Sequence, residues 1–240
     1  MPFTFAHPAI VLPFYKKTRL FSMTALIIGS MSPDFEYFFR MSVRSDFSHK
    51  VMGIFLFDLP ITLLIAYLFH FFIRDDLVKN LPFFLYRRFA NSLVFNWNQY
   101  CYCHWKVVLT SSLIGIFSHI GWDSFTHLSG YFVQQFSFLQ DSITILNKEI
   151  PIYKLLQHSS SLIGISLIGI FILQLPVVTT NSNNTISIQY WSLVIIITTL
   201  FFILYGSINE LGKAVVIIID GLFLGFILTP LIIKIIQRLF

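Results

Sequence analysis

The segment from His119 to His127 carries three side chains of the kinds that bind metal ions, namely His119, Asp123 and His127, spaced four residues apart. An α-helix makes one turn in about 3.6 residues, so these side chains would lie along one face with about 6 Å between neighbours. The residues around them are apolar, and an unpaired ionisable group in lipid is costly. We therefore interpret the triplet as a set of metal ligands rather than as a structural accident.

Four further residues of the same kinds are candidates, although each also has a simpler explanation. They are His7, Asp34, His49 and His158. A polar residue before Pro8 can merely begin a short helix, because Pro is favoured in the first helical turn. Asp34 follows Ser32 and Pro33, so on its local sequence alone it is better explained as a turn or helix-capping residue. Only their convergence in space would make them ligands.

The composition is that of an integral membrane protein. Hydrophobic residues make up 56% of the 240 residues and charged residues 11%, with a mean hydropathy of +0.77. Soluble domains contain about 25% charged residues. The Lys and Arg residues behind the net charge of +5 are concentrated in a few loops, which is typical of membrane topology and not of nucleic-acid binding. Nucleic acid is therefore not an expected partner, whereas membrane lipid is.

Five apolar segments are long enough to be helical spans, since a span needs about 20 apolar residues. They are Lys50 to Ile73, Val107 to Leu128, Ser159 to Val178, Tyr190 to Ile208, and Lys213 to Ile236. Two shorter apolar runs, Ala6 to Tyr15 and Leu20 to Met31, precede them and predict a short-helix hairpin that dips into the bilayer. We expect an all-α polytopic helical membrane bundle forming one domain over 1–240, with 1–178 as the core of the metal site and 179–240 as two additional spans.

The distribution of positive charge predicts where the candidate ligands lie. Cytoplasmic loops are enriched in Lys and Arg, which places the turn from Lys16 to Arg19, the stretch from Arg74 to Lys106 and the C-terminus on the cytoplasmic side. Following the chain from these anchors brings all the candidates to one level near the extracytoplasmic face. We therefore expect five separate segments to supply one site, and the predicted ligands are His7, Asp34, His49, His119, Asp123, His127 and His158.

Several stretches resemble an uncharacterised family of bacterial integral-membrane proteins. These stretches are Met1 to Ala9, Gly29 to Tyr37, Ser48 to His49, and Ser118 to His127. More distantly, the chain is similar to membrane-bound metal-dependent hydrolases and, through them, to the zinc-dependent phospholipase C and nuclease superfamily. The resemblance implies a bacterial inner-membrane location and carries the ligand roles of that superfamily, in order, onto the seven residues above. In the soluble enzymes the last of these His ligands, which corresponds to His158, is followed four residues later by a Glu, whereas this chain has Leu162 there. One or two zinc ions are therefore expected, and three at most.

The residue types suit hydrolysis at a metal centre. Imidazole and carboxylate bind Zn²⁺ or another divalent transition metal at about 2.0 to 2.2 Å, and a carboxylate can bridge two ions, which gives Asp34 and Asp123 the expected catalytic roles. A metal-bound hydroxide could then attack a phosphoester, and a phospholipid or lipid-linked phosphate suits a site in the outer half of a bilayer. The alternatives are a metal-binding or metal-transporting protein without hydrolytic activity, and a membrane scaffold whose polar groups bond only to each other.

Overall fold

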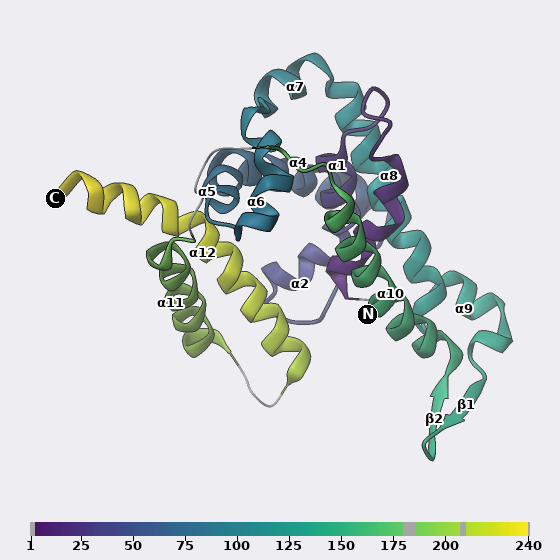
Figure 1. Ribbon diagram of the computed structural model, residues 1–240. Coiled ribbons are helices and arrows are strands. Elements are labelled where there is room, and N and C mark those ends of the chain that lie inside the picture. The colour runs from purple at the N-terminus through teal and green to yellow at the C-terminus, as the bar shows by residue number, and fades with distance from the viewer. Residues whose placement is uncertain (1–2, 180–185, 207–209, 240) are drawn as a thin grey trace. The chain divides into compact units, whose positions relative to one another are not determined.

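The computed structural model describes residues 3–179, 186–206 and 210–239, and within them the regular structure is almost entirely helical, as predicted (Figure 1). Met1, Pro2 and the predicted end of the fourth span at Ile208 lie outside the described residues. Four helical segments are long and apolar enough to cross a membrane, and they are Val51–Lys79, Ile152–Gln174, Ile188–Tyr205 and Leu211–Leu239. The helix predicted around His119 is present as α8 (Trp105–Thr126), but it is not among those four.

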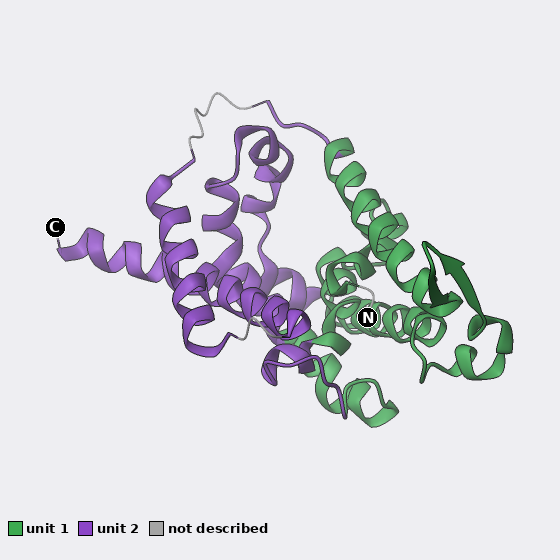
Figure 2. Cartoon of the chain, turned by 90° about the horizontal axis from the view of Figure 1, so that it is seen from below, with its two compact units in different colours: residues 1–34, 47–63, 104–174 green, residues 35–46, 64–103, 175–240 purple. Residues whose placement is uncertain are grey.

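The chain folds into two compact units, each assembled from three stretches of sequence (Figure 2). Unit 1 comprises Met1–Asp34, Phe47–Leu63 and His104–Gln174. Unit 2 comprises Phe35–Asp46, Leu64–Cys103 and Leu175–Phe240. All seven predicted ligands belong to unit 1. Unit 2 contains the last two long helices together with earlier segments, so it extends beyond the residues 179–240 that the sequence sets apart.

Unit 1 contains the predicted pair of short N-terminal helices, which pack against each other as η1 (Thr4–Phe14) and α1 (Met23–Gly29). The helix η1 is a 3-10 helix that contains Pro8 and Pro13. Proline has no backbone N–H to donate and clashes with the preceding helical turn, which explains why this segment does not form a regular α-helix. The remaining elements of unit 1 before α8 are η2 (Ser32–Asp34), α3 (Val51–Gly53), the π-helix η3 (Ile54–Asp58) and the start of α4 (Leu59–Leu68).

Two glycines allow α1 to approach α8 at backbone distance. A Cβ atom added at Gly29 would lie 2.5 Å from the carbonyl oxygen of Ser112, and one added at Gly115 would lie 2.5 Å from the carbonyl oxygen of Leu26. Real Cβ atoms do not come so close to backbone, so larger residues at either position would push the helices apart. This contact places Ser30, at the end of α1, beside the α8 turn that carries His119.

A short β-hairpin connects the end of α8 to α10 and was not predicted from the sequence. After α9 (Tyr131–Gln135) and η6 (Ser137–Leu139), strand β1 (Ser142–Ile145) pairs antiparallel with β2 (Lys148–Pro151). The two turn residues, Leu146 and Asn147, have φ angles of 49° and 62°, as a two-residue hairpin turn requires. The helix α10 (Ile152–Gln174) follows the hairpin directly and packs on η1, where Gly164 faces Ala6.

Unit 2 is dominated by α11 (Ile188–Tyr205) and α12 (Leu211–Leu239), which form the largest helix contact of the unit. Gly221 and Gly225 of α12 face the backbone of Thr198 and Val194 on α11, which lets the two helices pack closely. The stretch from Arg74 to Lys106 is not an extended loop but a series of short helices. The other elements of unit 2 are α2 (Phe35–Phe39), the π-helix η4 (Phe69–Ile73), α5 (Arg74–Lys79), α6 (Phe83–Phe89), η5 (Ala90–Val94) and α7 (Trp97–Cys103).

Candidate metal centre

Four of the predicted ligands form one compact group in unit 1. They are Asp34 at the end of η2, His49 just before α3, and His119 and Asp123 one turn apart on α8. One nitrogen or oxygen atom of each lies within 4.8 Å of one such atom of every other. Three separate segments therefore bring two imidazole and two carboxylate groups together, which are four of the seven residues predicted to converge.

The four distances between histidine and carboxylate atoms within this group are close to those between ligands of a single ion. The Nε2 atom of His119 lies 3.5 Å from Asp34 Oδ1 and 3.3 Å from Asp123 Oδ2. The Nε2 atom of His49 lies 3.9 Å from Asp34 Oδ1 and 3.5 Å from Asp123 Oδ2. Ligand atoms bound at about 2.1 Å from one ion at the corners of a tetrahedron are ~3.4 Å apart. The four measured distances are close to that value.

The hydrogen bond on the other side of the His119 ring fixes which of its nitrogens can bind a cation. Its Nδ1 atom donates to the carbonyl oxygen of Ser30 at 2.8 Å, because a carbonyl oxygen can only accept. In the neutral ring the proton is therefore on Nδ1, and the lone pair of Nε2 points toward Asp34 and Asp123. A metal-binding His commonly donates its second nitrogen to a carbonyl oxygen in this way.

The group lacks the hydrogen bonds that would make it a self-sufficient polar network. His119 Nε2, Asp34 Oδ1 and Asp123 Oδ1 are buried and have no hydrogen-bond partner among the described residues. Charge-assisted hydrogen bonds between nitrogen and carboxylate are about 2.7 to 2.9 Å long, shorter than any of the four distances above. Two carboxylates and an imidazole nitrogen therefore face one another at separations longer than such hydrogen bonds. A divalent cation is the partner that such an arrangement fits.

Two hydroxyl groups support the ligands from outside. The Thr4 hydroxyl donates to Asp34 Oδ2 at 2.6 Å, which leaves Oδ1 of the same carboxylate directed at His119. The Ser48 hydroxyl is hydrogen-bonded to His49 Nδ1 at 3.1 Å, which leaves Nε2 of that ring directed at the carboxylates. Neither Thr4 nor the Ser30 carbonyl group is predicted from the sequence to belong to the site. Every residue has a backbone carbonyl group, so the residue type does not reveal which of them accepts a hydrogen bond from a ligand. Nothing in the local sequence distinguishes Thr4 from a threonine outside the site.

His7 lies against the group from η1. Its ring stacks on that of His119 with a centroid distance of 3.8 Å, and its Nε2 atom lies 3.6 Å from Asp123 Oδ1. Burial, together with the adjacent His119, lowers the pKa of His7 to about 3, so the ring is neutral at physiological pH. Both of its nitrogens lack a hydrogen-bond partner among the described residues. The structure thus brings His7 to the second oxygen of Asp123, where a neutral imidazole has a lone pair to offer.

His127 also lies beside Asp123, but not as part of the helical face that the spacing predicts. The helix α8 ends at Thr126, and His127 has extended backbone angles, with φ −119° and ψ 142°. Its Nδ1 atom lies 3.5 Å from Asp123 Oδ2 and is 3.2 Å from the carbonyl oxygen of Asp123, to which it donates. Only Nε2 of His127 therefore has a lone pair, and its role as a ligand stays a prediction.

The structure does not bring His158 into the group. His158 is exposed on α10, whereas its neighbour Gln157 is buried. Successive helical residues point about 100° apart. Because Tyr153, Gln157 and Gly164 form the buried face of α10, His158 points away from it.

The group is closed on one side and open on the other. The side chains of Asp34 and His119 are 1% and 0% exposed, whereas those of His49 and His127 are each 27% exposed. Water can therefore contact the outer edges of these two rings. Structural zinc sites are closed by four protein ligands, whereas catalytic sites keep one position open.

The comparisons with known proteins identify a family but no activity. The model of a family described as Domain of unknown function (DUF4184) matches residues 1–231. The chain belongs to this family. The match to DUF4184 includes every residue of the candidate metal centre. No curated protein and no solved structure matches the chain.

Proposed function

We propose that this protein is a membrane-embedded metal-dependent hydrolase that acts on a phosphoester, with a phospholipid or lipid-linked phosphate as substrate. The observation that carries the proposal is the convergence of Asp34, His49, His119 and Asp123, whose buried acceptor atoms face one another at metal-ligand spacing. The four long apolar helices support a lipid substrate, because they would hold the group close to the bilayer.

Each ligand residue has a distinct task in this proposal. His119 is fixed by the Ser30 carbonyl group and Asp34 by Thr4, so these two side chains hold the ion in place. His49 forms the accessible edge past which a phosphoester enters. Asp123 directs one oxygen to His119 and the other to His7, as a carboxylate that bridges two ions would. When bound, a divalent ion lowers the pKa of a coordinated water to about 7 and stabilises charge on phosphoester oxygens.

The proposal also assigns a location and the number and type of ions. By the distribution of Lys and Arg, the site belongs near the extracytoplasmic face of a bacterial inner membrane. Zn²⁺ is the preferred ion, because imidazole and carboxylate are its usual ligands. The first ion would lie among the four-residue group, and the orphaned Asp123 Oδ1 and His7 Nε2 atoms support a second.

A non-catalytic metal-binding protein is the second candidate. It would need protein ligands on every side of the ion. The partial exposure of His49 and His127 favours the enzyme over this alternative, because it leaves a path for water and substrate.

The proposed activity is tested on detergent-purified protein with phospholipids and a water-soluble aryl phosphodiester as substrates. Zinc-loaded wild type should release product, and Asp123→Ala should lose the activity together with its metal. The matched control is Asp141→Ala, which removes an exposed carboxylate of the same unit and should leave both unchanged. Bound metal without turnover would favour the non-catalytic protein. Absence of metal from the wild type would favour a scaffold.

A further inference from the structure

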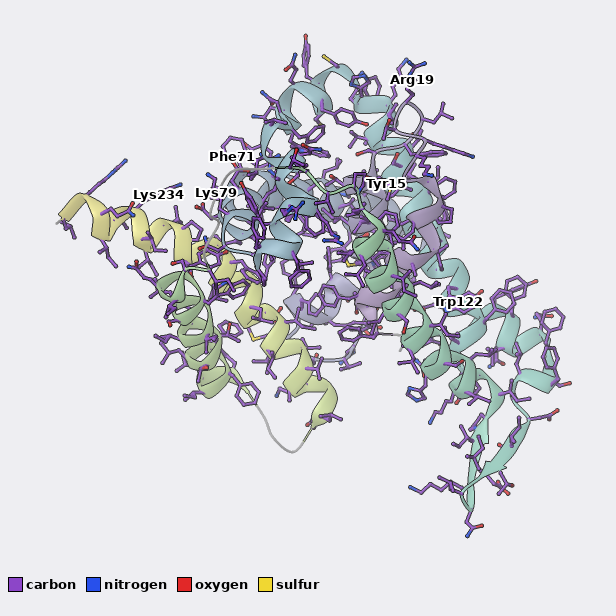
Figure 3. All side chains as sticks on the ribbon, in the orientation of Figure 1. Tyr15, Arg19, Phe71, Lys79, Trp122 and Lys234 are labelled. Carbon is purple, nitrogen blue, oxygen red and sulfur yellow. The ribbon has the colours of Figure 1, made fainter. Side chains whose placement is uncertain are left out.

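A pocket of about 270 Å³ lies in unit 1 beside His7, between η1, α8 and α10. Its walls are almost entirely hydrocarbon, and they include Ala6, Ala9, Ile10, Trp122, Ile163 and Leu167. The side chain of Trp122 lies between α8 and α10 (Figure 3). Its Nε1 atom donates to the Ser160 hydroxyl at 3.2 Å, and that hydroxyl donates to the Gln157 carbonyl oxygen at 3.1 Å. These polar wall groups are thus partnered with each other, and the space suits an apolar occupant.

The pocket exists because small residues line the contact between η1 and α10. Gly164 and Ala6 bring the two helices together at backbone distance, since a Cβ atom at Gly164 would lie 2.8 Å from the Ala6 carbonyl oxygen. Beside this contact, Ala9 leaves space that a longer side chain would fill. The remaining wall residues Ile163 and Leu167 are 57% and 49% exposed on a helix that is apolar enough to cross a membrane. A hydrocarbon chain could therefore enter directly from lipid.

One wall of this pocket is also a wall of the candidate metal centre. His7 lines the pocket, stacks on His119 and places its Nε2 atom 3.6 Å from Asp123 Oδ1. Trp122, another wall residue, directly precedes Asp123 on α8. The His7 ring therefore separates an apolar chain in the pocket from the Asp123 carboxylate. A molecule that combines such a chain with a phosphoester could occupy both places at once.

We infer that the pocket holds one linear hydrocarbon chain of the lipid substrate while its phosphoester lies at the Asp34, His49, His119 and Asp123 group. The inference rests on the proposed function, and it makes the substrate class a lipid with at least one unbranched acyl or alkyl chain. The polar path past His49 and His127 would then serve the head group and water.

The pocket can be tested without turnover by photo-crosslinking. The probe is a phosphatidylglycerol with a diazirine in the middle of one acyl chain, added to the full-length protein in detergent micelles. Crosslinks should concentrate on residues 6–10 and 160–167. Ala9→Leu adds three carbon atoms to the pocket wall and should reduce the crosslinks at least about ten-fold, since one methylene in an apolar pocket already changes discrimination about ten-fold. The matched control is Ala90→Leu, a half-buried alanine of unit 2. Crosslinks spread evenly over the apolar helices, and equal in Ala9→Leu and wild type, would overturn the inference.

Rates of hydrolysis of a long-chain and a water-soluble substrate distinguish this inference from the proposed function. Ala9→Leu should lower kcat/KM for a long-chain phospholipid about ten-fold while the water-soluble aryl phosphodiester is hydrolysed at the wild-type rate and metal content is unchanged. An equal loss on both substrates would contradict a chain-binding role. If wild type hydrolyses neither substrate but the crosslinks still map to the pocket, the proposed function fails while lipid binding at the pocket stands.

Discussion

Two polar clusters among the described residues are built around histidine, a buried one in unit 1 and a half-buried one in unit 2, and they differ in how their acceptor atoms are satisfied. In unit 2, Arg74 donates to His70 Nδ1 at 3.0 Å and to the Phe95 carbonyl oxygen at 2.7 Å, and it pairs with Asp75 at 2.7 Å. The His70 ring stacks on Trp97. Each of these acceptors thus faces a guanidinium donor, and no additional ion is needed. The cluster ties η4 to the loop before α7 and has a structural explanation.

In unit 1 the described residues place no Lys or Arg side chain against the two carboxylates of the group, which pair only with histidines. Asp34, Asp123 and the Nε2 atom of His119 face one another. The hydrogen bond that His119 donates to the Ser30 carbonyl oxygen and the one that Thr4 donates to Asp34 hold the ligands from outside. A buried polar network that lacks donors is unfavourable unless a cation completes it. The two clusters thus differ in their balance of hydrogen-bond donors and acceptors. This balance, rather than the presence of histidine, distinguishes a binding site from a structural cluster.

The largest expected difference between the clusters is their response to metal removal. A chelator should lower the melting temperature of wild type in detergent, since a ligand at about 1,000 times its Kd stabilises the native state by about 4 kcal/mol. The double variant Asp34→Asn, Asp123→Asn should show no chelator effect. The control Asp75→Asn changes the carboxylate that pairs with Arg74 in unit 2 and should respond to the chelator as wild type does. Equal responses of wild type and the double variant would remove the distinction between the clusters.

A smaller effect is expected from the support of Asp34. Thr4→Val removes the hydroxyl that donates to Asp34 Oδ2 and nearly preserves shape, so metal affinity should fall about 10-fold to 100-fold. Competition with a chromophoric chelator measures this change. Thr110→Val is the control, because the Thr110 hydroxyl bonds only to backbone carbonyl groups of α8 and is exposed. Affinities that agree for Thr4→Val and Thr110→Val would show that the Thr4 hydrogen bond does not support the ligand.

The smallest effect on metal binding is expected in unit 2. His70→Ala removes an acceptor of the buried Arg74, so it should lower the free energy of unfolding by about 1 to 3 kcal/mol while leaving metal content and affinity unchanged. Denaturant titration in detergent, followed by metal analysis of the same sample, separates the two quantities. A loss of metal from folded His70→Ala protein would mean that the two clusters are not functionally distinct.

Much of the candidate site follows from the sequence because helical geometry and membrane topology are strong constraints. The pair His119 and Asp123 is one turn apart on any helix, and the positions of the charged loops predict that Asp34 and His49 lie at the same level as this pair. The four residues do lie together in the structure. The long helices are likewise predicted by their apolar runs. Their ends are less well predicted: α10 begins at Ile152, before the expected Ser159, because the unpredicted β-hairpin leads directly into it.

The features that the sequence does not predict depend on rotation and close packing. The exposure of His158 is set by how α10 turns on its axis, which depends on the contact between Gly164 and Ala6. The tautomer of His119 depends on the Ser30 carbonyl group, which reaches the ring only because Gly29 and Gly115 let α1 and α8 approach closely. Such contacts involve backbone atoms, and residue types alone do not reveal them.

The most direct test of the account is the metal content of the purified full-length protein. Wild type and the double variant Asp34→Asn, Asp123→Asn would be purified in parallel in detergent without chelators, supplied with Zn²⁺, desalted and analysed by elemental mass spectrometry. The account predicts one or two zinc ions per wild-type chain and none in the folded double variant. Wild type without bound metal, or a double variant that retains the same amount, would contradict it.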